Sequence, residues 1–169
     1  MSSQALAFNG NRKGFILDGG MGAGWVSVDL RDFIGHKENK VAVTTDINIG
    51  LATSNRVGFF LCNKLSWFGL SQGPERKLYS SGLHALSFRY YDREEQTAYP
   101  TVGIGLATLS TPFSNDPHIW TGWGALIGVW LEYGRHTTLE LNLIYSSVSY
   151  YGLTIDCLAA RGVLLFSAF

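Results

Sequence analysis

The stretch KVAVTTDINIGL, residues 40–51, alternates along its whole length between large apolar side chains and small or polar ones. Side chains of an extended strand point to opposite faces in turn, so the alternation predicts a strand with two unlike faces. One face carries Val41, Val43, Thr45, Ile47, Ile49 and Leu51, and the other carries Ala42, Thr44, Asp46, Asn48 and Gly50. The charged residue therefore lies on the face with the smaller side chains.

The composition indicates where the larger, apolar face points. Only 15% of the 169 residues are charged, against about 25% in ordinary soluble domains, while 14% are aromatic and 20 are glycine. So few charged residues cannot cover the outside of a soluble barrel, and we expect the apolar face to contact lipid. The net charge is zero and no run of Lys and Arg stands out, which argues against a nucleic-acid partner.

Similar alternation recurs along the chain and predicts further strands. They lie near residues 14–28, 57–67, 79–91, 101–107, 122–133 and 138–146, with a last strand that ends at Phe169. Apolar runs such as Val163–Phe166 are far shorter than the roughly 20 residues of a membrane-spanning helix. We predict an all-β fold, an eight-stranded antiparallel up-and-down transmembrane β-barrel. Residues 14–169 form this single domain, and residues 1–13 form an N-terminal lead.

The connections between the predicted strands differ in length in a regular way. Longer connections are expected near residues 30–39, 69–78 and 110–120, and short ones at residues 54–55, 92–96 and 134–136. Transmembrane barrels have short periplasmic turns and longer outside loops. We therefore place the longer connections, together with residues 150–152, outside the cell, and both termini in the periplasm.

Aromatic residues mark the two ends of the predicted apolar belt. The loop-side girdle consists of Trp25, Trp67, Trp123 and Tyr145, and the turn-side girdle of Phe15, Phe59, Tyr90, Tyr133 and Phe169. The alternative is a soluble lipocalin-like barrel, whose Gly-x-Trp signature Ala23-Gly24-Trp25 matches in position only. The predicted outer faces of the first seven strands contain no Asp, Glu, Lys or Arg. Because a soluble barrel would be free to place charges there, we favour the membrane barrel.

The charged residues of the strands fall on the inner face. We expect a polar network in the lumen formed by Asp18, Asp46, Lys64, Arg89, Glu132, Glu140 and Arg161. Counting back by twos from Phe169 would turn Arg161 outward, so we predict a bulge near residues 160–162. The lumen is also expected to hold Phe60, Tyr99, Leu126, Trp130 and Ile144. Because an eight-stranded barrel is only just wide enough for its own side chains, we favour a filled, salt-bridged lumen over a pore.

The chain from Gly14 to Phe169 resembles the small eight-stranded bacterial outer-membrane barrels. Phe169 is similar to the C-terminal aromatic residue that these proteins present to their insertion machinery. The resemblance implies a monomer in a Gram-negative outer membrane, in contact with its lipids and lipopolysaccharide. The first residues, MSSQALAFNGNRKG, lack the features of a secretory signal, which we expect was removed or not included in this sequence.

One part of the chain is similar to the lipid A deacylase barrels. The similarity rests on Leu143-Ile144-Tyr145-Ser146-Ser147 and on Gly103-Ile104-Gly105-Leu106-Ala107. Those enzymes use a His-x-Ser pair with an acidic residue, whereas Ile144 stands where the histidine would be. Ser146 then lacks the base that a serine nucleophile needs, unless His84 or His136 reaches it from another strand. We assign no catalytic residue and do not favour an enzyme.

The remaining reactive side chains predict no cofactor and no metal site. His36, His84, His118 and His136 lie in separate segments without the spacing of metal ligands. Cys62 and Cys157 could pair or remain free. The first functional hypothesis is therefore a structural or surface-interaction barrel, whose loops present Phe33, Ile34, Trp120 and Tyr150. The alternatives are a lipid A deacylase-like hydrolase of the outer leaflet and a narrow channel for small solutes.

Overall fold

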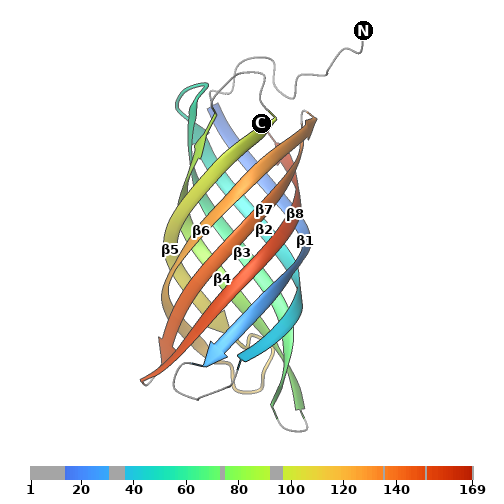
Figure 1. The fold of residues 1–169 in the computed structure, drawn as a ribbon, viewed down its shortest axis with the longest axis vertical. Helices are drawn as coiled ribbons and strands as arrows, with labels where there is room; N and C mark the ends of the chain where they lie inside the picture. Colours follow the sequence, from blue (N-terminus) through green and yellow to red (C-terminus); the bar gives the residue numbers. More distant parts are fainter. Residues whose placement is uncertain are drawn as a thin grey trace.

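The computed structural model describes residues 14–30, 37–72, 75–91, 97–134, 136–150 and 152–168. These residues form a closed barrel in which every strand pairs antiparallel with the next along the chain and β1 pairs with β8 (Figure 1). The strands are β1 Gly14–Leu30, β2 Lys37–Ala52, β3 Val57–Gln72, β4 Glu75–Tyr90, β5 Ala98–Ser110, β6 Ile119–Gly134, β7 Thr137–Tyr150 and β8 Leu153–Ala168. The predicted fold class is confirmed. No helix among the described residues is long and apolar enough to cross a membrane.

The strands are strongly tilted against the barrel axis, as the pairing register shows. One row of partners runs Gly20, Asp46, Lys64, Leu83, Ala107, Gly122, Val148 and Ile155, and returns to β1 at Leu30. The row thus reaches β1 again ten residues beyond its start. Such a stagger closes a narrow barrel whose interior is filled by side chains.

The apolar face of the strands points outward. On β2, Val41 is 82% exposed and Ile47 53%, whereas Asp46 on the opposite face is 2% exposed. The same division holds on β6, where Ile127 is 60% exposed and Trp130 is buried. The prediction for residues 40–51 is therefore confirmed: their large apolar side chains lie outside the barrel, and Asp46 lies inside.

The prediction of a long loop at residues 69–78 is wrong. β3 and β4 continue through it, with partners from Gly69 and Leu78 to Gln72 and Glu75, so that only residues 73 and 74 separate the two strands. Gly73 and Pro74 themselves lie outside the described residues. The hydrophobic alternation ends before the strands do, because backbone pairing continues where the side chains no longer form the apolar belt.

Two other connections are also shorter in the structure than the sequence predicted. β2 begins at Lys37, and its first residues pair with the end of β1, so residues 37–39 of the predicted loop 30–39 belong to a strand. The connection predicted at 110–120 consists of residues 111–118. The turn predicted at residues 92–96 and the N-terminal lead, residues 1–13, lie outside the described residues.

The predicted bulge at residues 160–162 is also wrong. β8 pairs with β7 and with β1 without a shift of register, and Arg161 lies inside the barrel together with Val163 and Leu165. Leu164 and Phe166 face outward instead. The prediction failed because it fixed the register of the strand on an outward Phe169, a residue that lies outside the described part of the chain. The observed register shift is in β6, between Glu132 and Gly134.

Candidate functional site

Charged side chains meet in the middle of the barrel. Asp18, Asp46, Lys64, Arg89, Glu140 and Arg161 are each 4% exposed or less, and Glu132 is half-buried. They come from every strand except β5 and project inward because alternate side chains of a strand point to the same face of the barrel wall. Charges in such a place are costly unless they are paired, so their contacts decide what the lumen can do.

Lys64 of β3 lies at the centre of the cluster. Its Nζ donates to Asp46 Oδ2 at 3.0 Å and to the two carboxylate oxygens of Glu140 at 2.7 and 2.8 Å. Asp46 is the register partner of Lys64 on β2, whereas Glu140 comes from β7. β3 and β7 are four strands apart in a ring of eight, so the Lys64–Glu140 ion pair spans the lumen.

Asp46 extends the cluster to a fourth charge. Arg161 of β8 donates through Nη2 to Asp46 Oδ1, while Lys64 binds the other carboxylate oxygen. Positive and negative groups therefore alternate from Glu140 through Lys64 and Asp46 to Arg161. This one chain of contacts connects strands β2, β3, β7 and β8 and reaches from one side of the barrel to the other.

A second charged group lies nearer the termini. Arg89 Nη2 is 3.4 Å from Asp18 Oδ2, and Ser167 Oγ donates to Asp18 Oδ1 at 2.6 Å. The guanidinium carbon of Arg89 also lies 3.4 Å from the ring centre of Phe60 and 3.0 Å from that of Trp130. A planar cation between two aromatic faces is a favourable arrangement that only Arg provides well. This stacking could not be predicted from the sequence, because the two rings come from strands other than that of Arg89.

Glu132 has a different environment from the six deeply buried charges. The hydroxyl of Tyr99 donates to Glu132 Oε2 at 3.0 Å, and the Tyr99 ring packs edge-on against Tyr91 at 4.7 Å. This group lies near the turn end of the barrel.

The loop-side half of the lumen is mainly apolar. It is filled by residues that include Val26, Val28, Phe68, Tyr79, Leu109, Val148 and Ile155. Toward the mouth, four rings follow one another: Phe68 is stacked on Tyr79 at 6.2 Å, Tyr79 on Trp120 at 6.4 Å, and Trp120 on His118 at 5.9 Å. Water and ions entering from the loop side therefore meet packed apolar side chains before they reach Lys64.

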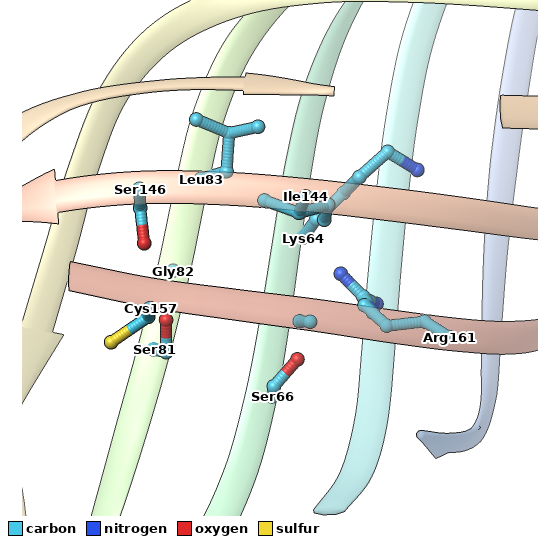
Figure 2. A pocket seen from close by; sticks show the side chains of 10 residues that line it. Lys64, Ser66, Ser81, Gly82, Leu83, Ile144, Ser146, Cys157 and Arg161 are labelled. Carbon is cyan, nitrogen blue, oxygen red and sulfur yellow. The ribbon is translucent and has the colours of Figure 1, made fainter. Parts of the chain in front are cut away.

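A small cavity remains between the charged cluster and the apolar half. Figure 2 shows Lys64 and Arg161 at one side of it, and Ser146, Ser81 and Cys157 at the other. Its volume is about 10 Å³, which is about the space of a single water molecule. The cavity is too small to be a passage or to hold a substrate.

The positions of Ser146 and the histidines bear on the hydrolase hypothesis. Ser146 is buried in the lumen beside Cys157, whereas His84 is exposed on the outer face of the wall. His136 lies at the turn end, with Nδ1 3.0 Å from the carbonyl oxygen of Ser167. Neither histidine can act as a base for Ser146, and the hydroxyl has no access to lipid. Cys62 and Cys157 are both free thiols.

The aromatic residues expected in the two girdles lie on the outer face wherever the structure describes them. Trp25, Trp123, Phe15, Phe59, Tyr90 and Tyr133 are exposed, and Trp67 and Tyr145 are half-buried. Trp123 packs edge-on against Tyr145 at 5.5 Å, and Trp67 Nε1 donates to Thr45 Oγ1 at 3.1 Å. Phe169 lies outside the described residues. The described residues contain no group of three or more His, Cys, Asp and Glu side chains that could hold a metal ion.

Comparison with known proteins gives structural neighbours only. No family model and no curated protein sequence matches the chain. Among solved structures, Neisserial surface protein A superimposes with a TM-score of 0.61 at 13% identity, over 90% of this chain and 96% of that one. Ail of Yersinia pestis follows with 0.60 at 9% identity, over 91% and 99%. The outer-membrane protein OprG of Pseudomonas aeruginosa gives 0.54 at 11% identity, over 94% and 98%.

The chain shares the fold of these barrels. Each neighbour is matched over nearly its whole length, so the barrel of this chain has the size of theirs. At 9 to 13% identity the likeness extends to architecture and not to binding sites.

Proposed function

We propose that this protein is an integral barrel of a Gram-negative outer membrane that serves as a closed scaffold and presents its loops at the cell surface. The membrane location is supported by the apolar outer wall between aromatic residues and by the fold shared with an outer-membrane protein such as OprG. β1 begins and β8 ends at the turn side of the barrel (Figure 1), and we propose that this side faces the periplasm.

The observation that carries the closed scaffold is the Lys64–Glu140 contact across the lumen. It joins opposite walls in the middle of the barrel, and the apolar side chains around Phe68 and Tyr79 fill the space between it and the loops. A permeating ion would have to separate buried ion pairs and displace packed rings. The lumen therefore confers stability and provides no path for solutes, which disfavours the channel. The buried position of Ser146 likewise disfavours the hydrolase.

The surface role rests on the connection between β5 and β6. Phe113 in this loop is 77% exposed, and its ring lies 6.3 Å from that of Trp67 on the outer wall. Trp120, one of the residues expected to contact partners, is half-buried in the ring stack at the mouth. Phe33, Ile34 and the side chain of Tyr150 lie outside the described residues. We propose lipids and lipopolysaccharide of the outer leaflet as the contacts of Phe113, and the insertion machinery as the partner of Phe169.

Two measurements on refolded protein test this function. Protein mixed with phospholipid vesicles should float with them in a density gradient and resist extraction by carbonate. Planar bilayers containing the same protein should show currents no larger than those of the lipid alone. Discrete conductance steps would contradict the closed lumen, and protein that stays at the bottom of the gradient would contradict the membrane location. Release of fatty acid from purified lipid A would reinstate the hydrolase.

A further inference from the structure

Two polar side chains lie side by side in the middle of the apolar outer wall. Asn63 of β3 and His84 of β4 are exposed on the outer face and are direct register partners. Asn63 lies midway between Phe59 and Trp67 on its strand, four residues from each, and so falls in the middle of the apolar belt. Within the described part of the chain, neither side chain makes a hydrogen bond.

Polar groups at this depth are expensive in a bilayer. The hydrocarbon offers no hydrogen-bond partner to the amide of Asn63 or to the imidazole of His84, and polar residues within membranes usually face protein or water. The free-energy cost of one polar side chain in contact with lipid is one that a stable barrel can tolerate. Two of them side by side, on a wall whose neighbouring outer positions are Ile47, Leu61 and Leu86, indicate a protein surface covered by another protein.

We propose that this wall is the interface of a homodimer, in place of the monomer expected from the sequence, and that Asn63 of each copy hydrogen-bonds His84 of the other. The inference rests on the proposed membrane location. Two copies with the same orientation in a membrane are related by a two-fold axis parallel to the barrel axes. If that axis passes beside the midpoint of the Asn63–His84 pair, Asn63 of each copy faces His84 of the other. The two contacts are then identical.

The shape of the wall favours a second copy as the occupant. A groove of about 340 Å³ is lined by residues that include Asn63, His84 and Ile49. A second groove of about 350 Å³, lined by Phe59, Phe88 and Val102 among others, adjoins it. Leu86 borders both grooves and is 57% exposed, so it forms a ridge between two hollows. A ridge beside a groove on the same surface is self-complementary, because each copy can insert its ridge into the other's groove.

Cysteine cross-linking in vesicles tests the geometry directly. In a background with Cys62→Ala and Cys157→Ala, chains with Asn63→Cys and chains with His84→Cys are mixed, refolded together and oxidised. The proposal expects a cross-link between the two kinds of chain. Leu143→Cys, an outward position on the opposite strand β7, provides the control and should cross-link only by random collision. Cross-linking of the mixed pair no faster than this control would overturn the proposal.

The strength of association tests the role of the polar pair. Energy transfer between labelled chains, measured while lipid is added, gives the dimer dissociation constant in the bilayer. Replacing both residues, Asn63→Leu with His84→Leu, should raise that constant roughly five- to tenfold, because it removes two weak hydrogen bonds between membrane-embedded segments. Heat-dependent gel mobility confirms that the variant is folded. A wild-type protein that is monomeric at every lipid ratio, or an unchanged constant in the variant, would contradict the dimer. Vesicle flotation separates these results from failure of the membrane location itself.

Discussion

Lys64 Nζ lies 2.7 Å from Glu140 Oε1, although the two residues are 76 positions apart in the sequence and come from opposite walls of the barrel. Their contact is possible because an eight-stranded barrel is narrow enough for two long side chains to meet across it. Asp46 and Arg161 complete the alternation of charge. The contact blocks the middle of the lumen. Each buried charge is compensated by its neighbours, so the removal of one leaves another without its partner.

Loss of the Glu140 charge should destabilise the barrel strongly. Glu140→Gln leaves Lys64 buried with only the Asp46 carboxylate among its described ion-pair partners, and Arg161 shares that carboxylate. We expect a loss of about 3 kcal/mol in the free energy of unfolding. Urea unfolding in vesicles measures it. The control is Glu38→Gln, which removes a half-exposed partner of Lys40 and should cost less than about 1 kcal/mol. Equal costs for the two variants would show that the buried cluster contributes nothing special.

Replacing both members of the spanning pair should cost less than replacing one. The double variant Lys64→Met with Glu140→Leu leaves Asp46 paired with Arg161 and buries no unpaired charge, so it should be more stable than Glu140→Gln. The same urea unfolding measurement compares the two. A double variant less stable than the single one would mean that the charges stabilise the barrel through contacts other than their mutual pairing.

Arg89 should not tolerate replacement by lysine. The lysine ammonium keeps the charge near Asp18 but cannot lie flat between Phe60 and Trp130, and we expect a loss of about 2 kcal/mol in unfolding free energy. The fluorescence of the tryptophans in urea follows this unfolding. The exposed Arg56 provides the control, since Arg56→Lys should leave the midpoint unchanged. If the two variants unfold together, the stacking is not a source of stability.

Two adjacent glycines of β1 should differ in their tolerance of a methyl group. A Cβ at Gly20 would overlap the carbonyl oxygen of Leu164 on β8, whereas a Cβ at Gly19 comes no closer than 4.0 Å to the carbonyl oxygen of Asp46. Gly20→Ala must push β1 from β8 at the seam that closes the barrel, at a cost of about 1–3 kcal/mol, and Gly19→Ala should be nearly neutral. Refolding yield, judged by heat-dependent gel mobility, distinguishes the two. Equal yields would contradict the close approach of β1 and β8.

The direction of each side chain was predictable from sequence over most of the barrel. Residues 40–51 alternate so regularly that one assignment, with Ile47 outside and Asp46 inside, fixes the rest of the strand. Arg161 was harder, because the inner face of β8 carries Val163 and Leu165 and thus lacks the small polar character that identifies the lumen elsewhere. A register counted back from Phe169 therefore placed these two residues on the wrong face.

The contacts within the lumen could not be predicted. Which residues meet depends on the stagger between strands, and only the pairing of the whole barrel brings Glu140 to Lys64. The same holds for Phe60 and Trp130 around Arg89. The ends of β3 and β4 were missed for another reason, because Gly69–Gln72 pairs through its backbone without a hydrophobic alternation that the sequence would show.

The sidedness of the wall is tested most directly by spin labels in vesicles. Nitroxides attached at Ile47→Cys and Val129→Cys, with Asn48→Cys as the inward control, are compared for collision with oxygen and with a water-soluble nickel complex. We predict that the labels at 47 and 129 are reached by oxygen and shielded from nickel, as sites in hydrocarbon are, and that the label at 48 is shielded from both. Labels at 47 and 129 that collide freely with nickel would place the apolar wall in water and contradict the account.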